Sequence, residues 1–109
     1  MEYYRIIMYN LFNSCFKINN IKPTVHEHML IYIRNNNLII SNKNTYTLTL
    51  IMNECIRYID ENYCDKFSNE KYSIAIQCMY DILQDKLTDN EFKHMMNLIK
   101  ACVFVHYEK

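Results

Sequence analysis

Apolar residues recur at three- and four-residue steps along most of this chain, in separate runs divided by polar stretches. Such spacing places the apolar side chains on one face of a helix. The first run lies within residues 3–16, and Asn19 and Asn20 end it. The pattern predicts an amphipathic helix over 3–16, whose apolar stripe consists of Tyr4, Ile7, Met8, Leu11, Phe12 and Cys15.

Two segments carry a capping box, in which a Thr side chain and a Glu three residues later each accept a hydrogen bond from the other's backbone amide. Thr24 and Glu27 are predicted to begin a second, short helix, which the asparagines at 35–37 end. Thr88 and Glu91 are predicted to begin the last helix. The core stripe of this last helix is expected to be Phe92, Met95, Met96, Ile99, Cys102 and Val103.

Two further helices are predicted between these boxes. After the last stripe, the end of the chain at residues 104–109 is expected to fray. The third helix is expected from about residue 45 to 63, with the stripe Leu48, Ile51, Met52, Cys55, Ile56, Ile59 and Tyr63. Asn44 or Thr45 is its expected cap. The fourth helix is expected to be capped by Ser68 or Asn69, with the stripe Tyr72, Ala75, Ile76, Met79, Ile82 and Leu83.

Residues 38–50 have two interpretations. Alternation and β-branching are typical of a hairpin between 38–40 and 45–50. The alternative places 45–50 in the third helix, because the apolar stripe continues without a break through Leu48. We favour the helix, with 38–40 as an apolar linker and a sixth short turn near 36–44.

The chain contains no glycine and one proline in 109 residues. Loops that cradle phosphates and dinucleotide fingerprints both need glycine, so these site classes are excluded and no cofactor is expected. Tight two-residue hairpins are also disfavoured, although Asn can replace glycine at some positions. The composition therefore favours helices joined by Asn-rich turns, in one all-α domain over residues 1–109 with about five to six helices.

Twelve basic and twelve acidic residues give a formal net charge of zero. Proteins that bind nucleic acid usually carry a basic excess, so no nucleic-acid partner is expected. A small helical nucleic-acid-binding regulator is kept as the alternative function, because residues 68–103 could form a helix-turn-helix. That stretch lacks a basic recognition helix, since its acidic residues outnumber its lysines.

No constellation of residues indicates catalysis or a metal site. His26 and His28 lie two apart, about 200° around a helix, and could not share a metal ion as an i,i+4 pair does. Cys55, Cys78 and Cys102 lie on apolar stripes, whereas Cys64 is the expected exposed thiol. We therefore expect no enzyme and no disulfide. The absence of an apolar run long enough for a membrane span and of a leader pattern predicts a cytoplasmic protein.

The second half of the chain resembles the C-terminal half of the poxvirus Bcl-2-like proteins. The resemblance covers roughly residues 45–100 and rests on the order and spacing of three segments, 47–59, 71–85 and 88–100. It implies a Bcl-2-like helical bundle in the host cytoplasm that sequesters a host apoptotic or innate-immune signalling protein. The chain is shorter than most of that family and lacks the glycine-containing signature of cellular relatives, so the resemblance does not extend to binding of pro-death peptides.

The family resemblance also implies a homodimer through a face that includes the first helix. Apolar residues wrap more than one face of the segment 3–16, whereas a helix packed on one core needs a single stripe. The surplus residues are the candidate interface for a partner or a second copy, and they are Tyr3, Ile6 and Tyr9.

Overall fold

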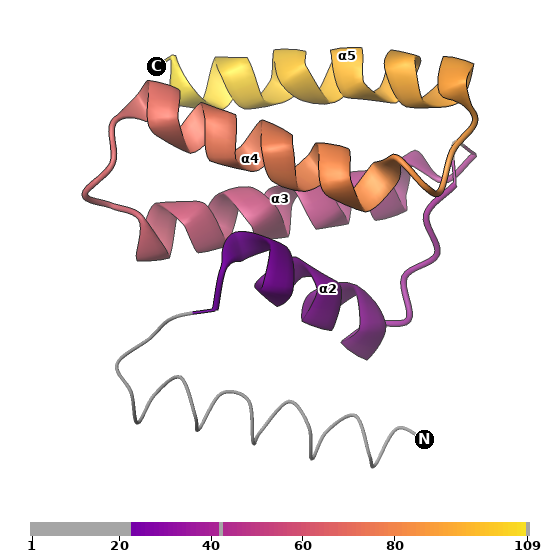
Figure 1. The fold of residues 1–109 in the computed structure, drawn as a ribbon, viewed down its shortest axis with the longest axis horizontal. Helices are drawn as coiled ribbons and strands as arrows, with labels where there is room; N and C mark the ends of the chain where they lie inside the picture. Colours follow the sequence, from indigo (N-terminus) through magenta and orange to yellow (C-terminus); the bar gives the residue numbers. More distant parts are fainter. Residues whose placement is uncertain (1–22, 42, 109) are drawn as a thin grey trace.

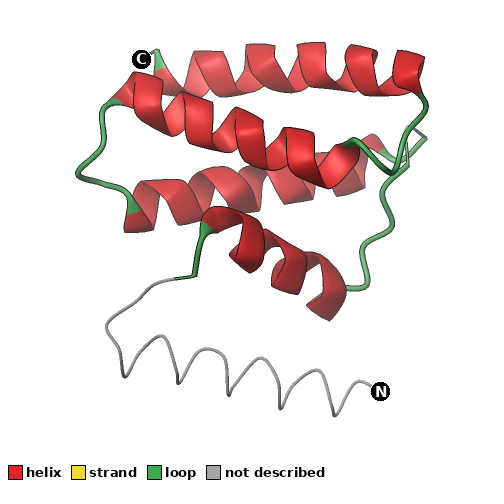
Figure 2. Cartoon of the chain, in the orientation of Figure 1, coloured by secondary structure: helices red, strands yellow, loops and turns green. Residues whose placement is uncertain are grey.

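The computed structural model describes residues 23–41 and 43–108, which form four helices and no strand (Figure 2). The helices are α2 (Val25–Asn35), α3 (Thr45–Asn62), α4 (Ser68–Leu83) and α5 (Asp89–Tyr107). The all-α class is confirmed for this part of the chain, with four helices rather than five or six. The predicted first helix at 3–16 lies outside the described residues.

The helical interpretation of residues 45–50 is confirmed, because they form the first turns of α3. The expected sixth turn near 36–44 is not helical at 36–41 or at 43 and 44. These residues form the connection between α2 and α3, with turns at Asn36, Asn37 and Lys43, and they add no further helix in the described part of the chain.

Helix α4 lies at the centre of the arrangement (Figure 1). It packs against α2, α3 and α5, and α2 also packs against α3. Its buried side chains are Ala75, Cys78, Met79, Ile82 and Leu83. One apolar cluster joins all four helices, with Met29, Ile51, Ile59, Met79, Leu83 and Val103 fully buried in it.

Both predicted capping boxes are confirmed. The Thr24 hydroxyl accepts from the Glu27 amide at 3.1 Å, and the Thr24 amide donates to the Glu27 carboxylate at 3.2 Å. Thr88 and Glu91 make the same reciprocal pair at 3.3 and 3.0 Å. The amides at each helix start have no partner inside the helix, so these side chains stabilise the first turns of α2 and α5.

The caps of the other two helices differ. Asn44 caps α3, because its Oδ1 accepts from the Thr47 amide at 3.1 Å. The prediction of Ser68 or Asn69 as the cap of α4 was wrong, since Phe67 occupies that position in extended conformation. The Phe67 amide donates instead to the Glu70 carboxylate at 3.4 Å, which leaves Ser68 as the first helical residue.

Helix α2 ends in a Schellman motif without glycine. Asn37 has a φ of 51°, and asparagine is among the few residues that adopt this left-handed conformation readily. The Leu38 amide donates to the Ile33 carbonyl at 3.0 Å, and the Asn37 amide donates to the Arg34 carbonyl at 3.1 Å. Asn37 therefore takes the place that glycine usually holds and turns the chain toward α3.

Two expectations for the last helix were wrong. Cys102 is exposed, because the buried face of α5 continues in four-residue steps through Met95, Ile99, Val103 and Tyr107 and leaves Cys102 at its side. The chain also remains helical through Tyr107 rather than fraying from residue 104. Burial of Tyr107 in the core accounts for this extension.

Removing the cap of α5 should reduce stability. In Thr88→Ala, one amide of the first turn loses its acceptor, and we expect the free energy of unfolding to fall by about 1 kcal/mol. Urea unfolding of Lys86→Ala, an exposed neighbour in the preceding turn, provides the control and should match wild type. Equal losses in the two variants would contradict the assigned cap.

The free energy of unfolding of variants at position 37 should depend on how readily the new residue adopts a positive φ. Asn37→Ala should lower the free energy of unfolding by roughly 1 kcal/mol, because a Cβ without a local polar partner disfavours positive φ. Asn37→Gly should unfold close to wild type in the same urea titration, since glycine adopts this φ without a steric cost. A stable alanine variant would mean that residue 37 does not hold a left-handed conformation.

Candidate functional site

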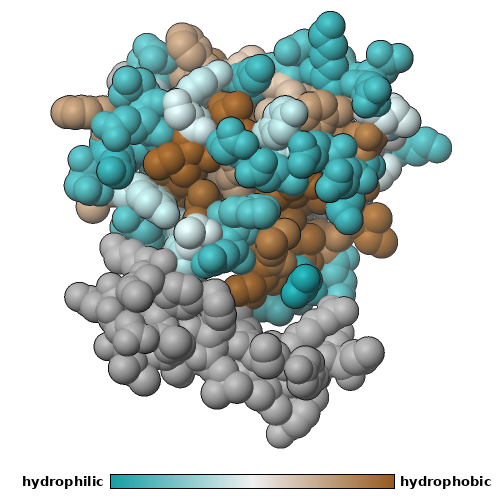
Figure 3. Space-filling view, viewed as in Figure 1, coloured by the Kyte–Doolittle hydropathy of each residue, from teal (hydrophilic) through white to brown (hydrophobic). Residues whose placement is uncertain are grey.

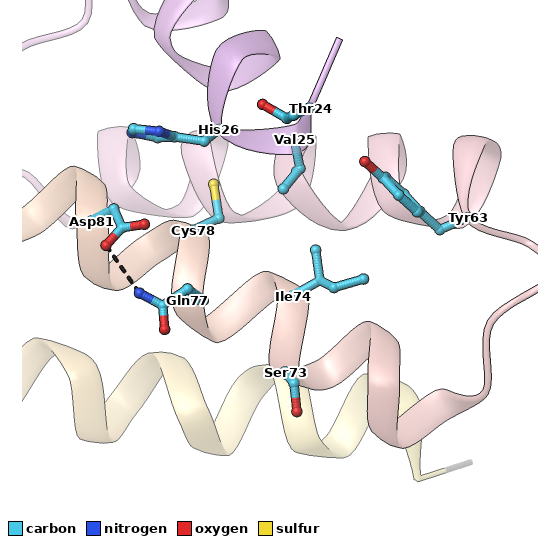
Figure 4. Close-up of a pocket in the computed structure, with 9 residues that line it drawn as sticks. All are labelled: Thr24, Val25, His26, Tyr63, Ser73, Ile74, Gln77, Cys78 and Asp81. Carbon is cyan, nitrogen blue, oxygen red and sulfur yellow. Dashed lines mark hydrogen bonds between the residues drawn. The ribbon is translucent and has the colours of Figure 1, made fainter. Parts of the chain in front are cut away.

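A groove opens between the start of α2, the end of α3 and the outer side of α4 (Figure 4). Its volume is about 480 Å³. Residues 24–26 form one wall, Tyr63 closes the end near α3, and α4 supplies the floor and the opposite wall. The α4 residues in it are Ser73, Ile74, Gln77, Cys78 and Asp81.

The groove combines an apolar interior with a polar edge. Val25 and Cys78 are buried at its base, and Ile74 is partly buried between them and solvent. Ser73 and Gln77 are exposed on the edge that α4 presents. The space-filling view shows apolar residues among hydrophilic side chains on the side of the molecule that it presents (Figure 3). Such a lining suits apolar side chains of a ligand better than a charged small molecule.

One acidic group stands at the edge of the groove. The Gln77 side-chain amide donates to Asp81 Oδ1 at 3.0 Å, one turn further along α4. This hydrogen bond fixes the direction of the Asp81 carboxylate beside the apolar floor (Figure 4). A basic group on a bound molecule would meet a negative charge here, which gives the groove a preferred direction of binding.

Cys78 does not have the character of a nucleophile. A hydrogen bond with Cys55 and burial both raise the pKa of the Cys78 thiol far above its usual range. A thiol that stays protonated reacts slowly, because the thiolate is the reactive form. His26 lines the same groove, but Cys78 acts there as a small apolar side chain.

Helix α2 is held in place by polar contacts with α3. His28 stacks on Tyr58 with ring centroids 4.0 Å apart and an interplanar angle of 11°. Its Nε2 also lies 2.7 Å from the Glu54 carboxylate. The Tyr58 hydroxyl donates to the Pro23 carbonyl just before the helix begins. These contacts position the α2 wall of the groove relative to the core.

Glu54 is shared between His28 and Arg57. The Arg57 guanidinium donates to Glu54 from one turn away and to Glu61 at 2.7 Å from its other side. The hydrogen bond from Arg57, helped by the one with His28, lowers the pKa of Glu54, although burial opposes this shift. Glu54 therefore remains an acceptor for His28 to lower pH than an isolated carboxylate would.

A second carboxylate on α3 joins the ends of α4 and α5. The His106 Nε2 lies 2.9 Å from one Asp60 oxygen, and the Lys71 ammonium lies 3.7 Å from the other. These groups are only partly buried, so their interactions contribute modestly to stability. They fix the C-terminal end of α5 beside α3.

The structure describes only some of the residues that the sequence singled out. Tyr3, Ile6 and Tyr9 lie outside the described residues. His26 and His28 point to different surroundings, one to the groove and the other to α3, as their spacing predicts. No group of metal-ligating side chains occurs in residues 23–41 and 43–108.

Sequence reasoning missed the groove. Its residues come from three elements, and its position depends on how α2 lies against α4. In the sequence of α4, the groove is marked only by the polar residues Ser73 and Gln77, which lie on either side of the apolar Ile74 at helical spacing. That pattern occurs on most surface helices and does not identify a site.

Comparison of the chain with protein-family models, curated proteins and solved structures found no match. None of the four described helices combines the length and the apolar character that a bilayer-spanning segment requires.

Glu54→Gln should reduce stability in a pH-dependent way. The folded state lowers the pKa of Glu54 from 4.5, so its charge stabilises the fold above that value and the benefit disappears as pH falls through the lowered pKa. We expect the variant to lose about 1 kcal/mol at pH 7 and to converge with wild type in strong acid.

Urea unfolding at pH 7 and across the range below 4.5 measures this difference. Glu61→Gln is the matched control, because it removes the other carboxylate on Arg57 from a more exposed position and leaves His28 untouched. A constant difference between wild type and Glu54→Gln at every pH would show that the charge of Glu54 does not hold α2.

Proposed function

We propose that the protein is a helical interaction module that sequesters a host apoptotic or innate-immune signalling protein. The observation that carries the proposal is the apolar groove with an acidic edge between α2 and α4. The resemblance of residues 45–100 to the poxvirus Bcl-2-like proteins supplies the host setting, the fold family and the class of partner. The mechanism is occupancy: while the host protein is bound, the surface in contact with the groove cannot bind the host protein's normal ligands.

The proposed occupant is an amphipathic helix of the partner. Helix-in-groove binding places apolar residues spaced three and four apart against an apolar floor. Ile74 and Cys78 of α4 provide such a floor, and Val25 adds an apolar side chain from the α2 wall. Asp81 at the edge favours a helix that carries a basic residue beside its apolar stripe.

Affinity in such a complex comes mainly from apolar burial. Each large apolar side chain that becomes fully buried contributes about 1.5–3 kcal/mol. Because association itself costs several kcal/mol, more than one such side chain must enter the groove. The buried face of α4 packs in the core beneath the groove, so the partner helix is expected to lie across the groove and to insert only its side chains.

Gln77→Arg should abolish partner binding without loss of fold. The substitution places a long cation on the exposed edge of the groove beside Asp81, where it blocks entry and neutralises the acidic edge. Gln84→Arg is the matched control, because it makes the same change at the exposed C-cap of α4, which does not line the groove.

The measurement is quantitative mass spectrometry of proteins that the tagged chain recovers from host cytosol, for wild type and both variants. We expect signalling or death-pathway proteins that bind wild type and Gln84→Arg and are at least tenfold depleted with Gln77→Arg. Recovery of the same proteins with Gln77→Arg would contradict the groove as the binding site. Recovery that nuclease treatment removes would favour the nucleic-acid-binding alternative.

A further inference from the structure

The groove lies at the point where the described part of the chain begins. Thr24 and Val25 contribute to its α2 wall, and Pro23 directly precedes them (Figure 4). The 22 residues before Pro23 therefore join the fold beside the groove. Their covalent link keeps them close to this site at any protein concentration.

The chain before Pro23 is long enough to enter the groove. The groove runs along α4 from Ser73 to Asp81, which is about two helical turns or roughly 12 Å. The helix predicted over residues 3–16 would be about 21 Å long. Residues 17–22, when extended, span at most about 20 Å. This length allows the predicted helix to fold back along the groove.

The sequence before Pro23 has the features of a ligand for this groove. The apolar stripe predicted for it includes Ile7, Met8 and Leu11, and Arg5 lies at the border of this stripe. The groove offers an apolar floor and the Asp81 carboxylate at its edge. Entry of the stripe would therefore bury apolar side chains and bring a cation to the acidic edge.

Net charge also favours this contact. Residues 1–22 contain three basic residues and one acidic residue, which gives a formal net charge of +2. Because the formal net charge of the whole chain is zero, residues 23–109 carry −2. The two parts of the chain therefore attract each other.

We propose that residues 3–16 occupy the groove of their own chain as an amphipathic helix and compete there with the external partner. This regulation rests on the groove as the binding site of the proposed function. A short linker gives an effective concentration in the millimolar range, so a segment with an intrinsic Kd of about 0.1 mM would fill roughly nine grooves in ten. The partner would then bind about tenfold more weakly than it binds the open groove.

A labelled synthetic peptide of residues 1–22 tests this occupancy by fluorescence anisotropy. The full chain with Ile7→Glu and Leu11→Glu carries charges on the stripe, so its groove opens and should bind the peptide about tenfold more tightly than wild type does. Asn10→Glu with Asn13→Glu adds the same charge on the opposite side of the predicted helix and should match wild type. Adding Gln77→Arg to the opened chain should abolish peptide binding, because it blocks the groove.

Hydrogen exchange of the full chain, followed by mass spectrometry, gives a second measurement without the peptide. Amides of residues 3–16 should exchange slowly in wild type and faster in Gln77→Arg, which excludes the segment from the groove. Gln84→Arg carries the same cation outside the groove and should keep the slow exchange. The slow exchange should persist on dilution, because the contact lies within one chain.

Several results would overturn the proposal. One is equal peptide affinity of wild type and the chain with Ile7→Glu and Leu11→Glu. Another is exchange of residues 3–16 that Gln77→Arg leaves unchanged, or slow exchange that is lost on dilution. If the two glutamates abolished cooperative urea unfolding, the stripe would belong to the core and not to a reversible occupant.

These readouts involve no host protein, so they separate this regulation from the proposed function. Host proteins that bind wild type and the opened chain equally would leave the proposed function standing and overturn the competition. Peptide binding and exchange as expected, with no host protein recovered through the groove, would support the occupancy and contradict the proposed function.

Discussion

The described structure depends on the burial of α4 from three directions. This helix packs against α2, α3 and α5, and its Ala75, Met79 and Leu83 are fully buried. Removing the large side chain of Met79 or Leu83 would leave a cavity that neighbouring helices fill only in part, so these two residues contribute strongly to stability. The remaining elements are arranged around this one helix.

The short helix α2 has the least apolar surface to contribute, and its position depends on polar contacts as well. Only Val25 and Met29 are buried in it. The stacking of His28 on Tyr58 and the hydrogen bond to Glu54 supply the remaining constraint on its direction. Because α2 forms one wall of the groove and α4 the other, the shape of the groove follows from these contacts.

The sequence predicts the local features of this fold well. The capping boxes at Thr24 and Thr88 mark two helix starts correctly, and the uninterrupted stripe through Leu48 favours the helix over the hairpin at residues 45–50. These features depend on residues within one turn of each other. The chain has no glycine, yet Asn37 after the end of α2 adopts the left-handed backbone conformation, as the prediction of Asn-rich turns allows.

Features that depend on packing between helices were not predicted. Cys102 has the spacing of a core residue, yet the buried face of α5 is set by its contact with α4 and continues to Tyr107 instead. The cap at Phe67 has no side-chain signal of its own, since only Glu70 completes it. The groove depends on how α2 lies against α4. The periodicity within a single helix carries no information about that placement.

Native-state hydrogen exchange tests the central position of α4 most directly. If the account is correct, amides from Ala75 to Leu83 exchange only through global unfolding, with an opening free energy equal to that of urea unfolding. Amides of α2 should exchange through a local opening of lower free energy. Exchange of the α4 amides at or below the free energy measured for α2 would contradict the claim that the fold is built around α4.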